Sequence, residues 1–110
     1  MTVSELEKKL GCSSAWAGWK DREITGVHTS DLLSDVMAHA VEGSLLITIQ
    51  AHKNTIAVAT LKDLSAVLIC SERPVPEDMA KAAEDEGVPI LVTPLNQYEA
   101  GWRVHGLLGS

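Results

Sequence analysis

The sequence predicts an α/β fold in which a mostly parallel sheet of about four to five strands carries helices on both faces. Strand-like and helix-like segments alternate along the chain, and single helices separate the strands. Two strand segments, residues 44–50 and 66–70, are nearly continuous apolar runs, which is typical of strands buried on both faces of a parallel sheet. The 110 residues suffice for one core, so we expect a single domain over residues 1–110.

The chain begins with a predicted helix over residues 3–10. Two leucines four residues apart give this segment one apolar face, Ser4 can cap its start, and Gly11 can end it. Residues 13–17 favour a strand only weakly. Residues 23–27 follow a charged turn and are expected to form a short strand.

The next predicted helix is the clearest one, and Ser30 can cap its start. Its apolar residues recur at the spacing of one buried helical face. They are Leu32, Leu33, Val36, Met37 and Ala40. Gly43 lies just past the end of this helix and precedes the first buried strand.

The second half of the chain continues the alternation. Asn54 can open a helix that runs to about residue 61 and precedes the strand over residues 66–70. Pro76 suits the first turn of a further helix, which Gly87 ends. Residues 88–92 are expected to form the last strand.

The last helix starts after Thr93 and Pro94 and has two apolar sides. One side carries Leu95, Tyr98, Trp102 and His105, and another carries Val104, Leu107 and Leu108. This is more apolar coverage than packing on a sheet requires, and a second subunit would cover the excess. We therefore expect a homodimer through this helix; the alternative is that the segment around Trp16 and Trp19 wraps it.

Composition excludes several classes of protein. Nine Lys and Arg against 15 Asp and Glu give a net charge of −6, which disfavours binding to nucleic acid. The longest uncharged apolar stretch is half a membrane span, and the N-terminus has no signal-peptide pattern. Cys12 and Cys70 form no metal-finger spacing. We expect a cytoplasmic protein with reduced thiols and no membrane partner.

Polar side chains gather where the predicted strands end. In open α/β sheets, ligands bind beyond the carboxyl ends of the strands. Three of the loops that follow the predicted strands run into helix N-termini, whose free N–H groups and dipole favour an anion. The same residue types can simply cap helices, so both interpretations stay open. The candidate ligand-binding residues are His28, Thr29, Ser30, Asp31, Gln50, His52 and Asn54, and we expect Thr29, Ser30, Gln50, His52 and Asn54 to face one pocket.

Metal and catalytic chemistry have weaker support. His28, His52 and Cys70 could converge on a metal, but no short ligand spacing favours this, and Cys70 fits a small buried side chain. Asp31 and Asp35 lie four residues apart and could act as acid and base, or serve the helix dipole and a polar face. Phosphate-binding, dinucleotide-binding, hydrolase and zinc-protease motifs are absent from the sequence. We expect no catalytic residue, metal or cofactor.

Several segments in order resemble a DRTGG-domain protein. They are residues 21–27 (DREITGV), 30–38 (SDLLSDVMA), 47–54 (ITIQAHKN), 57–59 (AVA) and 87–91 (GVPIL). The nearest counterpart of the DRTGG string is Asp21-Arg22 with Gly26. The resemblance implies a fold like the N-terminal domain of HPr kinase/phosphorylase. It also implies a regulatory part, as in phosphotransacetylases and nucleotide-regulated pyrophosphatases, that dimerises near a regulatory ligand. Stand-alone copies occur in anaerobic bacteria and are labelled serine-kinase-like.

Two functional hypotheses follow. The first is a non-catalytic regulatory or interaction module, dimeric, that senses a small anionic metabolite or nucleotide. The alternative is a small enzyme or serine-kinase-related protein that uses polar residues such as His28, Asp31 or His52 at the carboxyl edge of the sheet.

Overall fold

The computed structural model describes residues 1–109, and its centre is a five-stranded sheet in the order β1-β5-β4-β3-β2. The strands are β1 (Ser13–Ser14), β2 (Gly26–Thr29), β3 (Ser44–Thr48), β4 (Ala66–Ile69) and β5 (Ile90–Val92). The helices are α1 (Val3–Leu10), α2 (Leu33–His39), α3 (Lys53–Leu61), α4 (Glu77–Glu86) and α5 (Gln97–Leu108). Strands β2 to β5 are parallel, and β1 is antiparallel to β5. The predicted α/β class with a mostly parallel sheet is confirmed.

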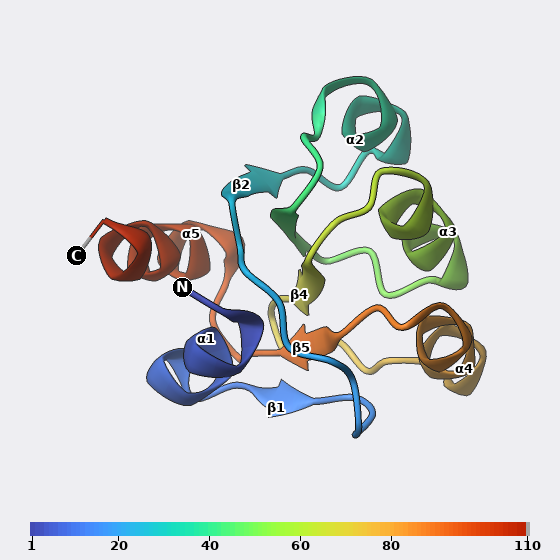
Figure 1. Ribbon diagram of the computed structural model, residues 1–110, viewed down its shortest axis with the longest axis horizontal. Helices are drawn as coiled ribbons and strands as arrows, with labels where there is room; N and C mark the ends of the chain where they lie inside the picture. The colour runs from blue at the N-terminus through green and yellow to red at the C-terminus, as the bar shows by residue number, and fades with distance from the viewer. Residues whose placement is uncertain (110) are drawn as a thin grey trace.

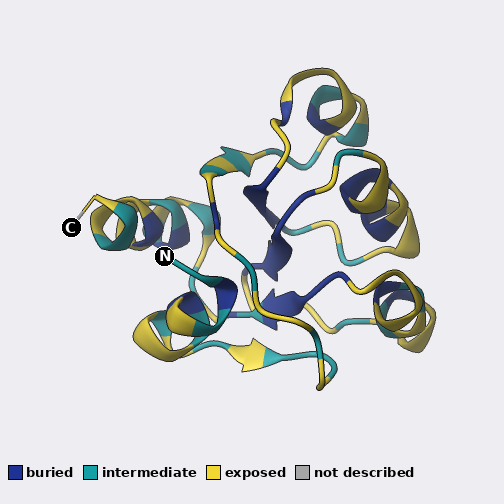
Figure 2. Cartoon of the chain, viewed as in Figure 1, coloured by how far each residue is buried: buried dark blue, intermediate teal, exposed yellow. Residues whose placement is uncertain are grey.

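Helices cover both faces of the sheet. In Figure 1, α1 and α5 lie on one side, and α2, α3 and α4 lie on the other. Leu45 and Ile47 of β3 pack toward α1 and α5, whereas Leu46 packs toward the other three helices. Every residue of β3 and β4 is buried, which Figure 2 shows as a dark centre between the layers. The two apolar runs are therefore strands buried on both faces, as predicted.

The start of α1 differs from the prediction in its capping residue. Thr2, not Ser4, is the N-cap, and it forms a capping box with Glu5. The Ser4 side chain instead hydrogen-bonds the Asp21 carboxylate, which joins the helix to the segment before β2. Gly11 ends the helix in the left-handed conformation, as expected.

Strand β2 begins three residues later than predicted. The preceding segment pairs with the N-terminus and not with β3. The Ile24 amide donates to the Met1 carbonyl, and Glu23 forms an isolated antiparallel β-bridge with Thr2. Pairing with β3 starts only at Gly26. The strand also ends later than predicted, at Thr29, so His28 and Thr29 belong to the strand and not to the loop after it.

Helix α2 is shorter and more exposed than the sequence suggests. Leu32, not Ser30, is its N-cap, and it makes no side-chain cap bond. Val36 and Ala40 are buried, but the Leu32 side chain is 64% exposed and Met37 is 39% exposed. The helix covers an edge strand, so only a narrow part of its apolar side reaches the sheet.

The remaining helix starts also shift by one to three residues. His52 caps α3 in place of Asn54, because its Nδ1 accepts a hydrogen bond from the Asn54 amide. Asn96 caps α5 in place of Thr93, and Pro76 lies at the N-cap of α4. The side chains of His52 and Asn96 accept hydrogen bonds from first-turn amides, whereas Pro76 makes no side-chain cap bond.

The two apolar sides predicted for the last helix have different environments. Val104 is fully buried, and Leu107 and Leu108 pack against the same core cluster. This second side therefore belongs to the interior. Tyr98 and Trp102 on the first side are 83% and 66% exposed. Of the segment expected as an alternative cover, Trp16 packs on the far side of the sheet under α2, α3 and α4, whereas Trp19 packs against the cluster that includes Ala100 and Val104 of α5.

Gly43 allows a close approach that a larger residue would block. Its φ is +83°, and a Cβ there would lie 2.2 Å from the Thr25 hydroxyl oxygen, which donates to the Glu42 carbonyl. We expect Gly43→Ala to lower the free energy of unfolding by about 2–4 kcal/mol, because left-handed strain and overlap add. Gly11→Ala, which shares the strain but has open space at Cβ, should cost only about 1 kcal/mol. Equal losses in chemical denaturation would contradict this account.

Candidate functional site

The carboxylate of Asp31 joins three segments at the carboxyl edge of the sheet. Its Oδ1 accepts hydrogen bonds from the Thr48 hydroxyl (2.9 Å), the Ile49 amide (2.9 Å) and the Gln97 side-chain amide (3.1 Å). Thr48 ends β3, and Gln97 begins α5. The loop after β2, the loop after β3 and the start of α5 are thus held to one oxygen atom.

Gln50 strengthens the same connection. Its side-chain amide donates to the Asp31 carbonyl oxygen (2.9 Å), and its own amide donates to the Thr48 hydroxyl (3.0 Å). The Thr55 hydroxyl of α3 donates to the Gln50 carbonyl (2.8 Å). These bonds fix the path of the β3–α3 loop from the strand to the helix. They make Gln50 and Asp31 neighbours, as the parallel pairing of β2 and β3 predicts.

His28 belongs to a separate polar group that faces α2. Its Nε2 lies 2.9 Å from Asp35 Oδ2, and His39 Nε2 lies 4.0 Å from the other Asp35 oxygen. Hydrogen bonding from His28 is the main cause that lowers the pKa of Asp35, and a hydrogen bond from Ser30 adds to it. Asp35 thus keeps its charge next to two imidazoles.

The other predicted residues lie along the same sheet edge without converging on Asp31. The Thr29 hydroxyl donates to the Ile47 carbonyl (3.0 Å), and the Ser30 hydroxyl accepts from the Leu32 amide (3.2 Å). His52 and Asn54 are exposed at the start of α3. Asn54 also lines a pocket of about 520 Å³ between α3 and α4. That these side chains share one ligand pocket stays a prediction.

Two members of the site carry no signal in the sequence. Gln97 is 66 residues from Asp31, and Thr48 reads as one more residue of a buried strand. The spacing of Asp31 and Asp35 suggests an acid–base pair, but the Asp35 carboxylate contacts His28 instead. Only the packing of α5 across the sheet brings Gln97 to the edge.

The thiols are held in their neutral form. Burial, together with the nearby Asp31 carboxylate, raises the pKa of Cys70 to about 11. Burial likewise raises the pKa of Cys12 to about 11, with a contribution from Glu7. Cys70 is the small buried residue at a strand end that the sequence predicts. Within residues 1–109, no three His, Cys, Asp or Glu side chains are grouped so that they could hold a metal ion.

The protein is thus a three-layer α/β domain whose strand-end loops are held together at one sheet edge. The DRTGG domain matches residues 23–107, and the chain belongs to this family. The resemblance read from the sequence is therefore confirmed. The comparison with curated proteins gives no match. Among the described residues, no helix has the length and apolar character needed to span a membrane.

A solved structure with the same fold is a regulatory region. It contains the CBS and DRTGG domains of the regulatory region of Clostridium perfringens pyrophosphatase, complexed with an activator, diadenosine tetraphosphate. The TM-score is 0.68 at 10% sequence identity, and the match covers 90% of this chain and 44% of that one. The chain thus spans less than half the length of the protein it matches.

Asp31→Ala should destabilise the protein through three lost hydrogen bonds. The Thr48 hydroxyl, the Ile49 amide and the Gln97 amide would lose their acceptor, and we expect the free energy of unfolding to fall by about 2–4 kcal/mol. Asp78→Ala, which removes an exposed acid from the first turn of α4, should cost less than about 1 kcal/mol. Urea unfolding of both variants tests this, and similar losses would contradict the role given to Asp31.

The lowered pKa of Asp35 makes a pH-dependent contribution to stability. A carboxyl group whose pKa falls on folding stabilises the native state above its unfolded pKa, ordinarily near 3.8, and loses that effect as the pH drops through the folded value. We expect Asp35→Asn to be less stable than the wild type at pH 7, with the difference shrinking below about pH 4. Denaturation at pH 7 and pH 3 measures the difference. A gap that stays constant would show that His28 does not favour the charged form.

Proposed function

We propose that this protein is a non-catalytic regulatory module that binds a small anionic metabolite or nucleotide at the carboxyl edge of β2 and β3. The observation that carries the proposal is the hydrogen-bond network of Asp31. It holds the loops after β2 and β3 and the start of α5 in one arrangement. Pre-organised loops at this edge are where open α/β sheets bind ligands.

The start of α3 offers the donors that an anion needs. His52 Nδ1 accepts the Asn54 amide proton, so in the neutral ring the hydrogen lies on Nε2, which is free to donate. His52, Lys53 and Asn54 are all exposed, and Lys53 adds a positive charge in the first turn. The positive end of the helix dipole acts in the same direction.

The solved relative supports the regulatory part of the proposal. It is a regulatory region, and it is complexed with a nucleotide activator. We infer that the present domain likewise responds to a ligand and passes the effect to another part of a protein or to a partner. The proposal includes a cytoplasmic location, since free thiols such as Cys12 and Cys70 persist in a reducing compartment.

The competing proposal is a small enzyme at the same edge. The observation that favours it is the pairing of His28 with Asp35 at 2.9 Å, beside the Ser30 side chain. A carboxylate that orients an imidazole is common in acid–base and nucleophilic catalysis. Here Ser30 contacts Asp35 and Leu32. This arrangement suits binding better than proton transfer.

A ligand screen by thermal shift separates the two proposals. A nucleotide at 100 times its Kd should stabilise the protein by about 2.7 kcal/mol, a shift of several degrees. We expect His52→Ala and Lys53→Ala to weaken that shift, while Lys81→Ala on the exposed face of α4 leaves it unchanged. Recovery of the nucleotide unaltered supports the regulatory module. Turnover that His28→Ala abolishes would establish the enzyme.

We further propose that two copies of the chain associate through the outer side of α5. Tyr98 and Trp102 are largely exposed one turn apart, although the solvent side of a helix is usually polar. Val27 of the edge strand β2 is also exposed. It pairs in register with Leu45 of β3, so its side chain lies on the face of the sheet that α5 covers. Interfaces favour Trp and Tyr, and a two-fold axis would let both copies use the same patch.

Trp102→Ala should weaken this dimer. Loss of a central aromatic side chain typically costs at least 1–2 kcal/mol, so we expect the dimer Kd to rise about tenfold or more. Leu61→Ala, which removes an equally exposed side chain from α3 on the opposite side of the sheet, should have no effect. Light scattering over a concentration series is the measurement. A constant mass near 11.8 kDa at high concentration would rule out the dimer.

A further inference from the structure

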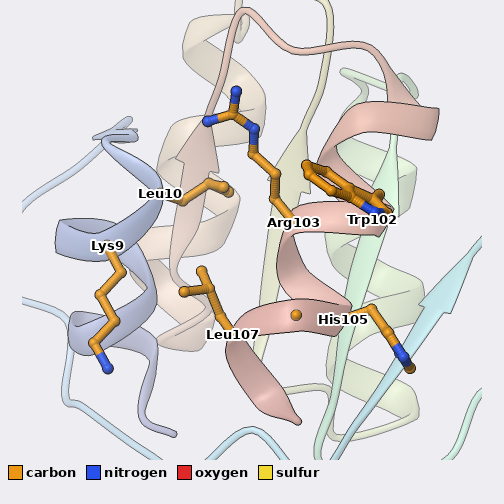
Figure 3. A pocket seen from close by; sticks show the side chains of 7 residues that line it. Lys9, Leu10, Trp102, Arg103, His105 and Leu107 are labelled. Carbon is orange, nitrogen blue, oxygen red and sulfur yellow. The ribbon is translucent and has the colours of Figure 1, made fainter. Parts of the chain in front are cut away.

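A groove between α1 and α5 lies apart from the edge described above. It has a volume of about 540 Å³, within the usual range for small-molecule sites. Figure 3 shows α1 on one side, with Lys9 and Leu10, and the last turns of α5 on the other. Gln97 at the sheet edge is nine residues before Gly106 of the groove, about 14 Å along the helix. The two places are therefore distinct.

Gly106 is one of the residues that line the groove. It lies inside α5, where glycine is less stable than alanine, and a Cβ there would meet no atom within 4 Å. Nothing within residues 1–109 therefore requires a glycine at this position. Leu10 and Leu107 point toward each other across the groove in Figure 3 and supply an apolar wall. A glycine with open space above it lets a bound molecule approach the helix backbone closely.

The rim of the groove is positively charged in an acidic protein. Lys9 and Arg103 line it, and none of its lining residues within positions 1–109 is acidic, although the chain carries a net charge of −6. Arg103 makes an ion pair with Glu99 at 3.3 Å, and both side chains are about half exposed. Exposed pairs of this kind contribute little free energy, so Arg103 can turn to a stronger anionic partner.

Trp102 adds a flat aromatic surface beside these charges. It precedes Arg103 in the same turn and is 66% exposed where it lines the groove. An indole face stacks on planar rings, while a guanidinium and an ammonium bind phosphate or carboxylate oxygens. A ligand that satisfies all three groups needs an aromatic ring and a negative charge at one end.

We propose that the groove between α1 and α5 binds an aromatic anion of the size of a nucleoside monophosphate. The ring lies against Trp102 and Leu107, and the anionic group meets Arg103, while Lys9 on the opposite wall adds positive charge to the groove. This site goes beyond the proposed ligand site, because it shares no residue with the carboxyl edge of the sheet, and it shares Trp102 with the proposed dimer interface.

The test uses adenosine 5′-monophosphate as the probe, followed by calorimetric titration and tryptophan fluorescence. Adenosine without its phosphate and inorganic phosphate without its ring should each bind at least tenfold more weakly. Gly106→Ala adds a methyl group to the lining of the groove and should raise the midpoint of thermal unfolding while weakening binding at least tenfold. Gly101→Ala is the matched control, since it makes the same change in α5 outside the groove, with open space at Cβ.

Charge variants complete the test. Lys9→Glu and Arg103→Glu should each abolish measurable binding, whereas His52→Ala at the sheet edge should leave it unchanged. Failure of the probe to bind, or equal binding by the Gly106 and Gly101 variants, would overturn the groove. Binding lost in His52→Ala but kept in Gly106→Ala would overturn it too and would support the sheet-edge site.

Light scattering of each variant is run in parallel, and a loss of binding that follows a change of oligomeric state would assign these residues to a subunit interface.

Discussion

One carboxylate oxygen, Asp31 Oδ1, holds the carboxyl edge of this sheet together. A negatively charged acceptor makes stronger hydrogen bonds than a neutral one, and this oxygen receives three. Two of the donors come from the end of β3 and the residue after it, and the third comes from α5. The orientation of α5 across the sheet is thereby linked to the loops that precede α2 and α3.

The burial of β3 and β4 on both faces explains why polar chemistry is restricted to the edges. Their side chains fill two cores, one under α1 and α5 and one under α2, α3 and α4. Such strands have no free face for a ligand. The polar groups that remain available lie where the strands end or on the helices that cover them.

The distribution of charge separates the two sides of the molecule. Helix α4 carries Glu77, Asp78, Glu84, Asp85 and Glu86 with a single lysine, so much of the acidic excess lies on one covering helix. Helix α1 has Lys8 and Lys9 in its last turn. These lysines also offset the negative end of the α1 dipole. Since α1 also carries Glu5 and Glu7, it has no net charge, and the acidic excess belongs to the α4 side.

Much of the fold could be predicted from the chain alone, and the candidate site only in part. The apolar runs of β3 and β4 and the glycines at 11 and 87 specify their elements locally, because burial on both faces and left-handed helix ends leave direct patterns. The capping residues were predicted one to three positions away, since a cap depends on where the loop leaves the sheet. No local pattern predicts that Gln97 bonds Asp31 across 66 residues or that His28 pairs with Asp35. Nor does the sequence indicate that Tyr98 and Trp102 are exposed while Val104 is buried. Those relations depend on which helices cover which face of the sheet, and packing between distant segments decides that.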